Sequence, residues 1–162
     1  MSQRAAELLR VVHESPGVTR VDAAKQLGIG TGLATEIVAG LVANQLVAER
    51  PAERTGGRGR PTTELGPHPA GPLVLAASLT HEEWRIRAVE LGGTSVAEAG
   101  ENHTGARSAD VVAQMAAAAT RLRRRFPTRV RAMAVSAPGT IEGTTLVHAT
   151  SADWREVELR AI

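Results

Sequence analysis

The residues with the clearest chemical potential form an arginine- and glycine-rich stretch, Arg54-Thr55-Gly56-Gly57-Arg58-Gly59-Arg60-Pro61. Two of its arginines flank Gly59, which has no side chain and lets the backbone approach a partner closely. Arginines presented in this way suit the narrow, negative minor groove of DNA. We therefore predict that Arg58, Gly59 and Arg60 enter the minor groove. A flexible, solvated loop is the alternative interpretation.

A second group of polar residues lies at the start of a helix predicted over residues 31–44. In a helix-turn-helix, the first turns of the second motif helix face base edges in the major groove. Here those positions are Thr31, Gly32, Thr35 and Glu36. Threonine can donate to phosphate or contact a thymine methyl group, and glutamate can accept from cytosine N4. The residues predicted to contact phosphates, and so to fix the register without reading sequence, are Thr19, Arg20 and Lys25. An ordinary small helical bundle is the alternative.

Other reactive side chains do not form recognisable sites. The five histidines lack a metal-binding interval such as H-E-x-x-H, and Ser136 lies in V-S-A-P-G rather than in a G-x-S-x-G nucleophile elbow. A run of arginines, Arg121, Arg123, Arg124 and Arg125 followed by Arg129 and Arg131, marks the end of a predicted helix. Such cations stabilise a helix C-terminus through its dipole, and a second phosphate contact is the alternative. No catalytic residue, metal site or cofactor is predicted.

The elements that would position the first two groups can be inferred from apolar spacing. Ala5, Leu8, Leu9 and Val12 predict a first helix, which Ser15-Pro16-Gly17 ends. Thr19 is a suitable N-cap for a second helix over residues 20–27, with Val21, Ala24 and Leu27 facing inward. A third helix would bury Leu33, Ile37, Val38, Leu41 and Val42. Strands are expected at residues 46–49 and 62–65. Three helices followed by a β-hairpin predict a winged helix-turn-helix.

The chain changes in character at Gly66-Pro67-His68-Pro69-Ala70-Gly71-Pro72, a stretch typical of an extended linker. Strands are expected beyond it at residues 73–79, 84–91 and 94–99, then a helix from an N-cap at Ser108 to about residue 125, then a strand at 130–135. We therefore predict a winged helix-turn-helix domain (1–66), a linker (67–72) and a partial α/β domain of the actin-like or ribonuclease-H-like type (73–162).

Composition limits the classes of protein that fit. The chain has 162 residues, 43% of them hydrophobic and 22% charged, and it has no cysteine, which excludes disulfides and thiolate sites. The charged N-terminus and the short apolar runs predict a soluble, cytoplasmic protein that does not enter a membrane. The 19 basic and 17 acidic residues nearly balance. The high pI of about 10.3 arises because one lysine and no tyrosine or cysteine are present to titrate. DNA binding would therefore depend on local placement of charge.

Residues 18–47, V-T-R-V-D-A-A-K-Q-L-G-I-G-T-G-L-A-T-E-I-V-A-G-L-V-A-N-Q-L-V, resemble the winged-helix regulators of the ROK family, which comprises repressors and sugar kinases built on an actin-like fold. G-R-G-R-P (57–61), V-S-A-P-G-T-I-E-G (135–143) and D-W-R-E-V-E-L (153–159) extend the resemblance along the chain. It implies a DNA-binding transcriptional repressor whose partners are double-stranded DNA and a sugar effector.

The sequence also departs from the family pattern. The ROK kinases carry an Asp-x-Gly phosphate loop on the first strand of the second domain, where this chain has Ser78 and Thr80. The family's catalytic Asp, zinc-binding loop and second lobe would follow the last residue of this sequence. We therefore expect a non-enzymatic regulator with weakened sugar sensing. A partial sheet would leave Val130, Met133 and Val135 without partners, which predicts a homodimer. A sugar kinase-like fragment, or a truncated dimerisation partner of a full-length regulator, is the alternative.

Overall fold

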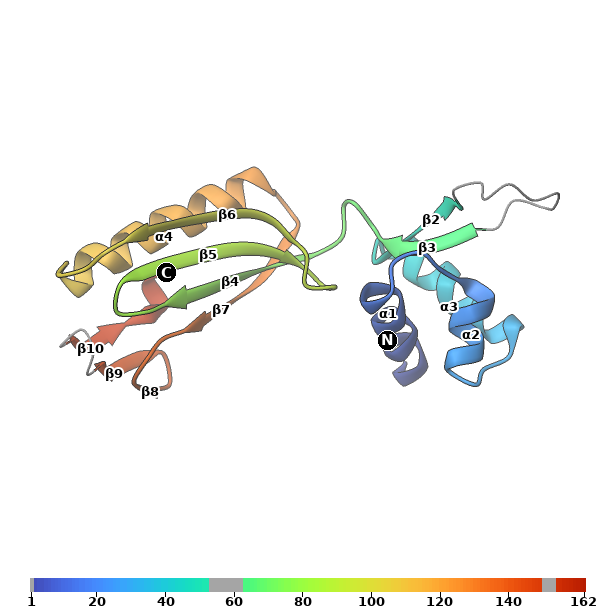
Figure 1. The fold of residues 1–162 in the computed structure, drawn as a ribbon, viewed down its shortest axis with the longest axis horizontal. Helices are drawn as coiled ribbons and strands as arrows, with labels where there is room; N and C mark the ends of the chain where they lie inside the picture. Colours follow the sequence, from blue (N-terminus) through green and yellow to red (C-terminus); the bar gives the residue numbers. More distant parts are fainter. Residues whose placement is uncertain (1, 53–62, 150–153) are drawn as a thin grey trace. The chain divides into compact units, whose positions relative to one another are not determined.

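A computed structural model describes residues 2–52, 63–149 and 154–162 of the chain. The chain folds into two compact units (Figure 1). The first comprises Met1–Pro72 with Glu90–Gly93, and the second comprises Leu73–Val89 with Thr94–Ile162. Each unit has its own hydrophobic core, so each is described by itself.

The first unit contains three helices, α1 (Gln3–Glu14), α2 (Arg20–Gln26) and α3 (Thr31–Ala43). A small sheet accompanies them, with strands β1 (Val18–Thr19), β2 (Val47–Pro51) and β3 (Thr63–Pro67) in the order β1-β3-β2. Both outer strands pair with β3 antiparallel. The helices and the sheet share one core, formed by Leu8, Val12, Ala24, Ala34, Val38, Leu41, Val47 and Leu65.

Most of the predicted inward residues of α2 and α3 are buried or pack against the core, but two of them are exposed. Val21 is 64% exposed and Leu33 is 45% exposed, whereas Ala23 and Ala34 are fully buried. Apolar residues surround most of α3, so spacing alone cannot choose its inner face. Contact with α1 and α2 buries Ala34, Val38 and Leu41 and leaves Leu33 outside the core. The strand β3 also continues to Pro67, one residue into the stretch that was expected to be a linker.

A four-stranded sheet forms the centre of the second unit. Its strands are β4 (Leu73–Leu79), β5 (Glu83–Glu90), β6 (Ser95–Asn102) and β7 (Val130–Ser136), in the order β6-β5-β4-β7. The helix α4 (Ser108–Arg125) connects β6 to β7, which pairs parallel with β4. The predicted β-β-β-α-β order is therefore confirmed. The N-cap of α4 is Arg107, without a side-chain cap, and not Ser108 as predicted, because the backbone already becomes helical at Ser108.

The two faces of this sheet have different chemistry. Alternate residues of β4, namely Leu73, Leu75, Ala77 and Leu79, are buried in a core that also contains Met115 of α4. Val130, Met133 and Val135 are half-buried and pack against this same core, so the prediction that they lose their partners is wrong. The partners belong to this shared core, to which β4, β5 and α4 all contribute side chains.

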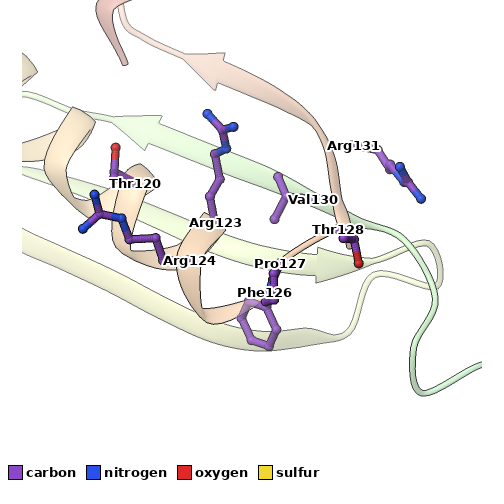
Figure 2. Close-up of a pocket in the computed structure, with 8 residues that line it drawn as sticks. All are labelled: Thr120, Arg123, Arg124, Phe126, Pro127, Thr128, Val130 and Arg131. Carbon is purple, nitrogen blue, oxygen red and sulfur yellow. The ribbon is translucent and has the colours of Figure 1, made fainter.

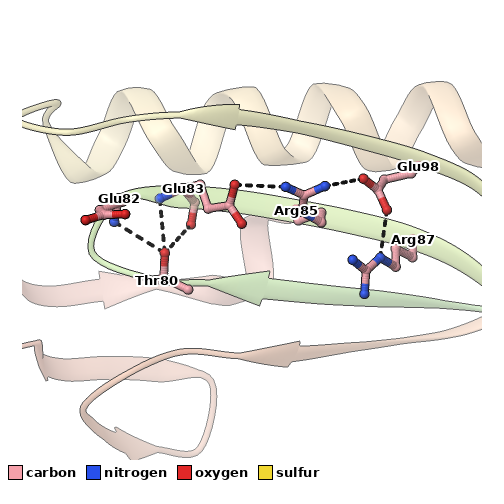
Figure 3. Close-up of polar contacts among 6 residues, drawn as sticks. All are labelled: Thr80, Glu82, Glu83, Arg85, Arg87 and Glu98. Atoms are coloured by element: carbon pink, nitrogen blue, oxygen red, sulfur yellow. Dashed lines mark hydrogen bonds and ion pairs between the residues drawn. The ribbon is translucent and has the colours of Figure 1, made fainter.

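The opposite face of β5 and β6 carries a chain of ion pairs (Figure 3). Arg85 pairs with Glu83 at 2.9 Å and also with Glu98, and Arg87 pairs with Glu98 at 2.7 Å. These side chains alternate with the buried Trp84 and with Ile86 and Ala88 along β5. A sheet with one face in solvent has charged residues on that face and buried apolar residues on the other.

The last part of the chain adds a small antiparallel sheet with the order β10-β9-β8. Its strands are β8 (Thr140–Glu142), β9 (Thr145–Ala149) and β10 (Trp154–Glu158), and a short 3-10 helix, η1 (Leu159–Ala161), follows. The sheet contributes Leu146, Trp154 and Val157 to the core of the second unit. None of the described helices alone is long and apolar enough to cross a membrane; α2 and α3 pass that test only together, with a bend of 115° between them.

Candidate nucleic-acid interface

A groove of about 640 Å³ lies where the starts of α2 and α3 meet the start of β3. It brings together four residues predicted to contact DNA from separate parts of the sequence, Thr19, Arg20, Thr31 and Thr35. Thr31 and Thr35 are exposed, and Thr19 and Arg20 are half-buried. The groove is therefore open to a partner and has hydroxyl groups from the N-cap of α2 and from the first turns of α3.

Thr19 fixes the beginning of α2. Its Oγ1 accepts from the backbone N–H of Asp22 at 3.1 Å and donates to Asp22 Oδ2 at 2.6 Å. The predicted N-cap is thus confirmed. Because Thr19 also pairs with Glu64 in the β1–β3 ladder, the cap ties α2 to the sheet as well as to the preceding turn. The hydroxyl of Thr19 is engaged in this cap, so its main role in the structure is to hold α2 in place.

The beginning of α3 is built differently. Its N-cap is Gly30, which provides no side-chain cap, so the first backbone N–H groups of α3 are not covered by a side chain. Gly32 is exposed, and a methyl group added to it would meet no atom within 4 Å. Uncapped N–H groups and the positive end of the helix dipole together favour an anion such as phosphate. The first turn of α3 is thus compatible with close approach of a phosphate backbone.

The hydroxyl of Thr35 has a local partner. Thr35 Oγ1 donates to the carbonyl oxygen of Thr31 at 2.9 Å, one helical turn earlier. This bond uses the donor that was expected to reach a phosphate. Thr35 therefore presents to the groove a methyl group and the acceptor side of its hydroxyl. A methyl group of this kind suits contact with thymine.

Arg20 is paired within the protein. Its guanidinium forms an ion pair with Glu49 on β2, and its Nε is buried without a hydrogen-bond partner. The cation predicted to contact phosphate is therefore partly neutralised by a carboxylate in the same unit. Lys25 lies exposed in the last turn of α2 and does not line the groove.

Glu36 is separated from the threonines. It is exposed, but it lines a different hollow, of about 550 Å³, together with Leu33, Ile37 and residues of α1. The residues predicted to contact bases therefore lie on two sides of α3. The residues of the predicted minor-groove clamp, Arg58, Gly59 and Arg60, lie outside the described residues.

Three groove residues were not identified from the sequence as site residues, and one of them is Asp22, the acidic residue that Thr19 contacts at the start of α2. Thr63, at the start of β3, and the exposed Val21 both line the groove. Thr63 reaches it because β3 pairs with β1 directly before α2. That pairing involves only two residues of β1, which is too short for an alternation pattern to reveal it. Val21 was instead assigned to the core.

No family model matches the chain, and no curated protein matches it. Among solved structures, the chain resembles one described as "Crystal structure of the ROK family transcriptional regulator, homolog of E.coli MLC protein". The TM-score is 0.60 and the sequence identity is 20%. The similarity covers 96% of this chain and 40% of that one, so the chain spans less than half the length of that regulator. The predicted mixed α/β fold is confirmed, and this chain shares it with a ROK family transcriptional regulator.

Proposed function

We propose that this chain is a non-enzymatic transcriptional regulator of the ROK type, a repressor whose first unit binds duplex DNA as a winged helix-turn-helix. In this proposal α3 enters the major groove, with Thr31, Gly32 and Thr35 facing the bases from one side of the helix and Glu36 from the other. Arg20 and Lys25 contact phosphates beside them, and Arg58 and Arg60 enter the minor groove. The observation that carries the proposal is the open groove that joins the starts of α2 and α3.

The geometry of α2 and α3 supports this assignment. The two helices meet at 115° across a four-residue break that contains Gly28 and Gly30. Helix-turn-helix motifs join their helices at roughly 90–120° through a turn of 3–4 residues, often with glycine. Gly28 adopts a φ of 60°, a conformation that glycine accepts without strain. The hairpin of β2 and β3 follows α3, as the wing does in winged-helix proteins.

The turn between β4 and β5 supports the absence of kinase activity. Thr80 Oγ1 accepts from the backbone N–H groups of Glu82 and Glu83 at 3.3 and 3.0 Å (Figure 3). A phosphate-binding turn needs such N–H groups free and pointing at the ligand. Here both N–H groups already donate to Thr80. The carboxylates of Glu82 and Glu83 also lie at this turn, where they would repel a phosphate. ROK-type kinase chemistry has no support at this position.

Helix-turn-helix proteins usually act as dimers, because two half-sites lie about 34 Å apart along the duplex. We therefore include a homodimer in the proposal. Light scattering after gel filtration tests it directly. A folded monomer at high micromolar concentration would contradict the homodimer. DNA binding by the first unit of a single chain would then be the remaining part of the proposal to test.

The function is tested by a salt-titrated DNA-binding assay with the region upstream of the chain's own gene. Fluorescence anisotropy should show saturable binding, with a plot of log affinity against log salt that falls with a slope of about −0.9 per phosphate contacted. The double variant Arg58→Ala/Arg60→Ala should weaken binding and make the slope less steep by about 2 units. The charge-matched control Arg155→Ala/Arg160→Ala removes two arginines of the second unit and should leave both quantities unchanged.

The outcomes separate the candidate functions. A slope near zero would contradict phosphate contact as the basis of action. DNA binding that is unchanged in the Arg58/Arg60 variant would favour a dimerisation partner of a full-length regulator. Hydrolysis of ATP in the presence of a glucose-type sugar would instead favour the kinase alternative.

A further inference from the structure

An unusual charge distribution marks the segment that contains the end of α4 and the start of β7. Six arginines lie between residues 121 and 131, and no acidic residue occurs between Asp110 and Glu142. Arg123 and Arg124, from the last turn of α4, and Arg131, from β7, line a single pocket of about 540 Å³ (Figure 2). Arginines from α4 and from β7 thus line the same pocket.

The helix dipole explains only part of this arrangement. A helix C-terminus favours cations within its last turn, which accounts for Arg123 and Arg124. It gives no reason for Arg131, which belongs to a strand. Like charges three or four residues apart on a helix are also destabilising, as Arg121 is to Arg124 and Arg125. This cost, in a segment without an acidic residue between Asp110 and Glu142, favours an anion that is not part of the chain.

Five of the six arginines fall into two sets, and Arg121 belongs to neither. Arg125 and Arg129 lie over the ring of Phe126, with their guanidinium carbons 5.3 and 5.7 Å from its centroid. In the described part of the chain, Arg123, Arg124 and Arg131 form no ion pair. The first set is held by an aromatic side chain, whereas the second set lines the pocket and is available to a ligand.

The pocket wall supplies more than charge. The exposed Thr120 and Thr128 contribute hydroxyl groups, and Thr128 has a φ of 66°, which is rare and strained for a β-branched residue. Strain of this kind is concentrated at functional sites. A second hollow of about 330 Å³ shares Arg123 and Arg131 and adds the apolar side chain of Met133. The surface therefore combines a cationic rim with an apolar floor.

We propose that this surface, the α4–β7 groove, binds a small phosphate-bearing metabolite. Guanidinium groups bind phosphate oxygens through paired hydrogen bonds, and hydroxyl groups add further donors. The two hollows have the volume of small-molecule sites, about 300–1,000 Å³. An apolar floor suits the carbon body of a metabolite. We assign the surface to a small ligand because Arg123, Arg124 and Arg131 all line one pocket of about 540 Å³, a volume that suits a small molecule. This site is additional to the proposed DNA interface and does not depend on it.

The test measures binding of inorganic pyrophosphate to the full chain. Isothermal titration calorimetry at fixed ionic strength gives the affinity and the number of sites. We expect saturable binding with one site per chain. The variant Arg123→Gln/Arg131→Gln should weaken this binding at least tenfold. The control Arg155→Gln/Arg160→Gln removes the same charge from exposed positions of the second unit and should change the affinity less than twofold.

A further variant keeps the test decisive if the glutamine variant unfolds. Arg123→Lys/Arg131→Lys retains the charge but loses the planar pairs of donors, so it should bind pyrophosphate with intermediate affinity. Absence of saturable binding to the wild-type chain would overturn the proposal. So would an equal loss of affinity in the groove variant and its control, which would indicate attraction to net charge alone. Loss of DNA binding in the groove variant, with pyrophosphate binding unchanged, would assign the groove to DNA and would also overturn it.

Discussion

The guanidinium of Arg20 and the carboxylate of Glu49 form an ion pair that links the first residue of α2 to β2. The side chains are equally accessible, each 36% exposed. An exposed pair of this kind contributes little to folding stability. Its main effect is on the candidate interface, because it places a carboxylate beside Arg20, which lines the groove.

Replacement of Glu49 by glutamine should therefore strengthen DNA binding. The substitution removes the negative charge and leaves Arg20 able to contact a phosphate, so the salt slope should become steeper by about 0.9. Anisotropy titrations at several salt concentrations measure both quantities. Glu14→Gln is the control, because it removes an equivalent charge from the exposed pair with Arg10 on α1. Weaker binding of the Glu49 variant would contradict this role of the pair.

Substitutions of Gly32 test whether α3 meets DNA. A glutamate at this position points into open space, so it should fold normally but repel phosphate and weaken binding at least tenfold. The control Gly32→Ala should raise the free energy of unfolding by up to about 1 kcal/mol, because glycine is a poor helix former. It should also preserve most of the DNA affinity. Equal DNA binding by the two variants would place the duplex elsewhere.

The N-cap at Thr19 gives a prediction about stability. Thr19→Ala should lower the free energy of unfolding by about 1 kcal/mol, because the backbone N–H of Asp22 loses its acceptor. Thr19→Ser keeps the hydroxyl and should lose much less. Urea denaturation of both variants measures the difference. Similar losses in the two variants would show that the methyl group, not the cap, stabilises this end of α2.

The ion pairs on the open sheet face give a prediction about pH. Hydrogen bonds from Arg87 and then Arg85 lower the pKa of Glu98 from its ordinary value of 4.5. A lowered carboxyl pKa stabilises the folded state above the unfolded-state value, and that contribution is lost as the pH falls through the folded-state pKa. NMR titration of the side-chain carboxyl should show Arg87→Gln raising the pKa toward 4.5. Arg155→Gln should leave it unchanged.

Gly139 and Gly143 form a matched pair for testing backbone constraint. A Cβ at Gly139, where φ is 145°, would collide with the carbonyl oxygen of His148. At Gly143, where φ is 62°, a Cβ would meet no atom within 4 Å. Gly143→Ala should therefore cost about 1–2 kcal/mol from backbone strain alone. Gly139→Ala should cost clearly more, as thermal or urea denaturation would show. Equal costs would mean that the turn moves to relieve the collision.

Much of the fold could be predicted from local patterns. The strand β4 follows its apolar run from residue 73 to residue 79, and α2 begins after the residue whose hydroxyl suits an N-cap. Such features depend on neighbours in sequence, so the sequence displays them. The burial of α3 depends instead on which neighbouring helices contact it. Leu33 was predicted to face the core, whereas packing exposes it and buries its neighbour Ala34.

The candidate site could be predicted in part. Four residues that were selected on helix-turn-helix spacing do meet at one groove. The internal partners of two of them, Glu49 for Arg20 and the carbonyl of Thr31 for Thr35, could not be predicted. The first depends on the packing of β2 beside α2, and the second on a choice of side-chain rotamer. Neither leaves a signal in residue spacing.

The parallel pairing of β4 with β7 has a consequence for how the chain is made. The first residue of β4, Leu73, and its partner Val130 are separated by two strands and a helix, so β7 must wait for all of these to leave the ribosome. Pairings between distant segments form slowly because the intervening chain loses entropy when its ends meet. Until then, the edge of β4 that β7 will cover stays open to other nascent chains, so the risk of aggregation persists until residue 136 has left the ribosome.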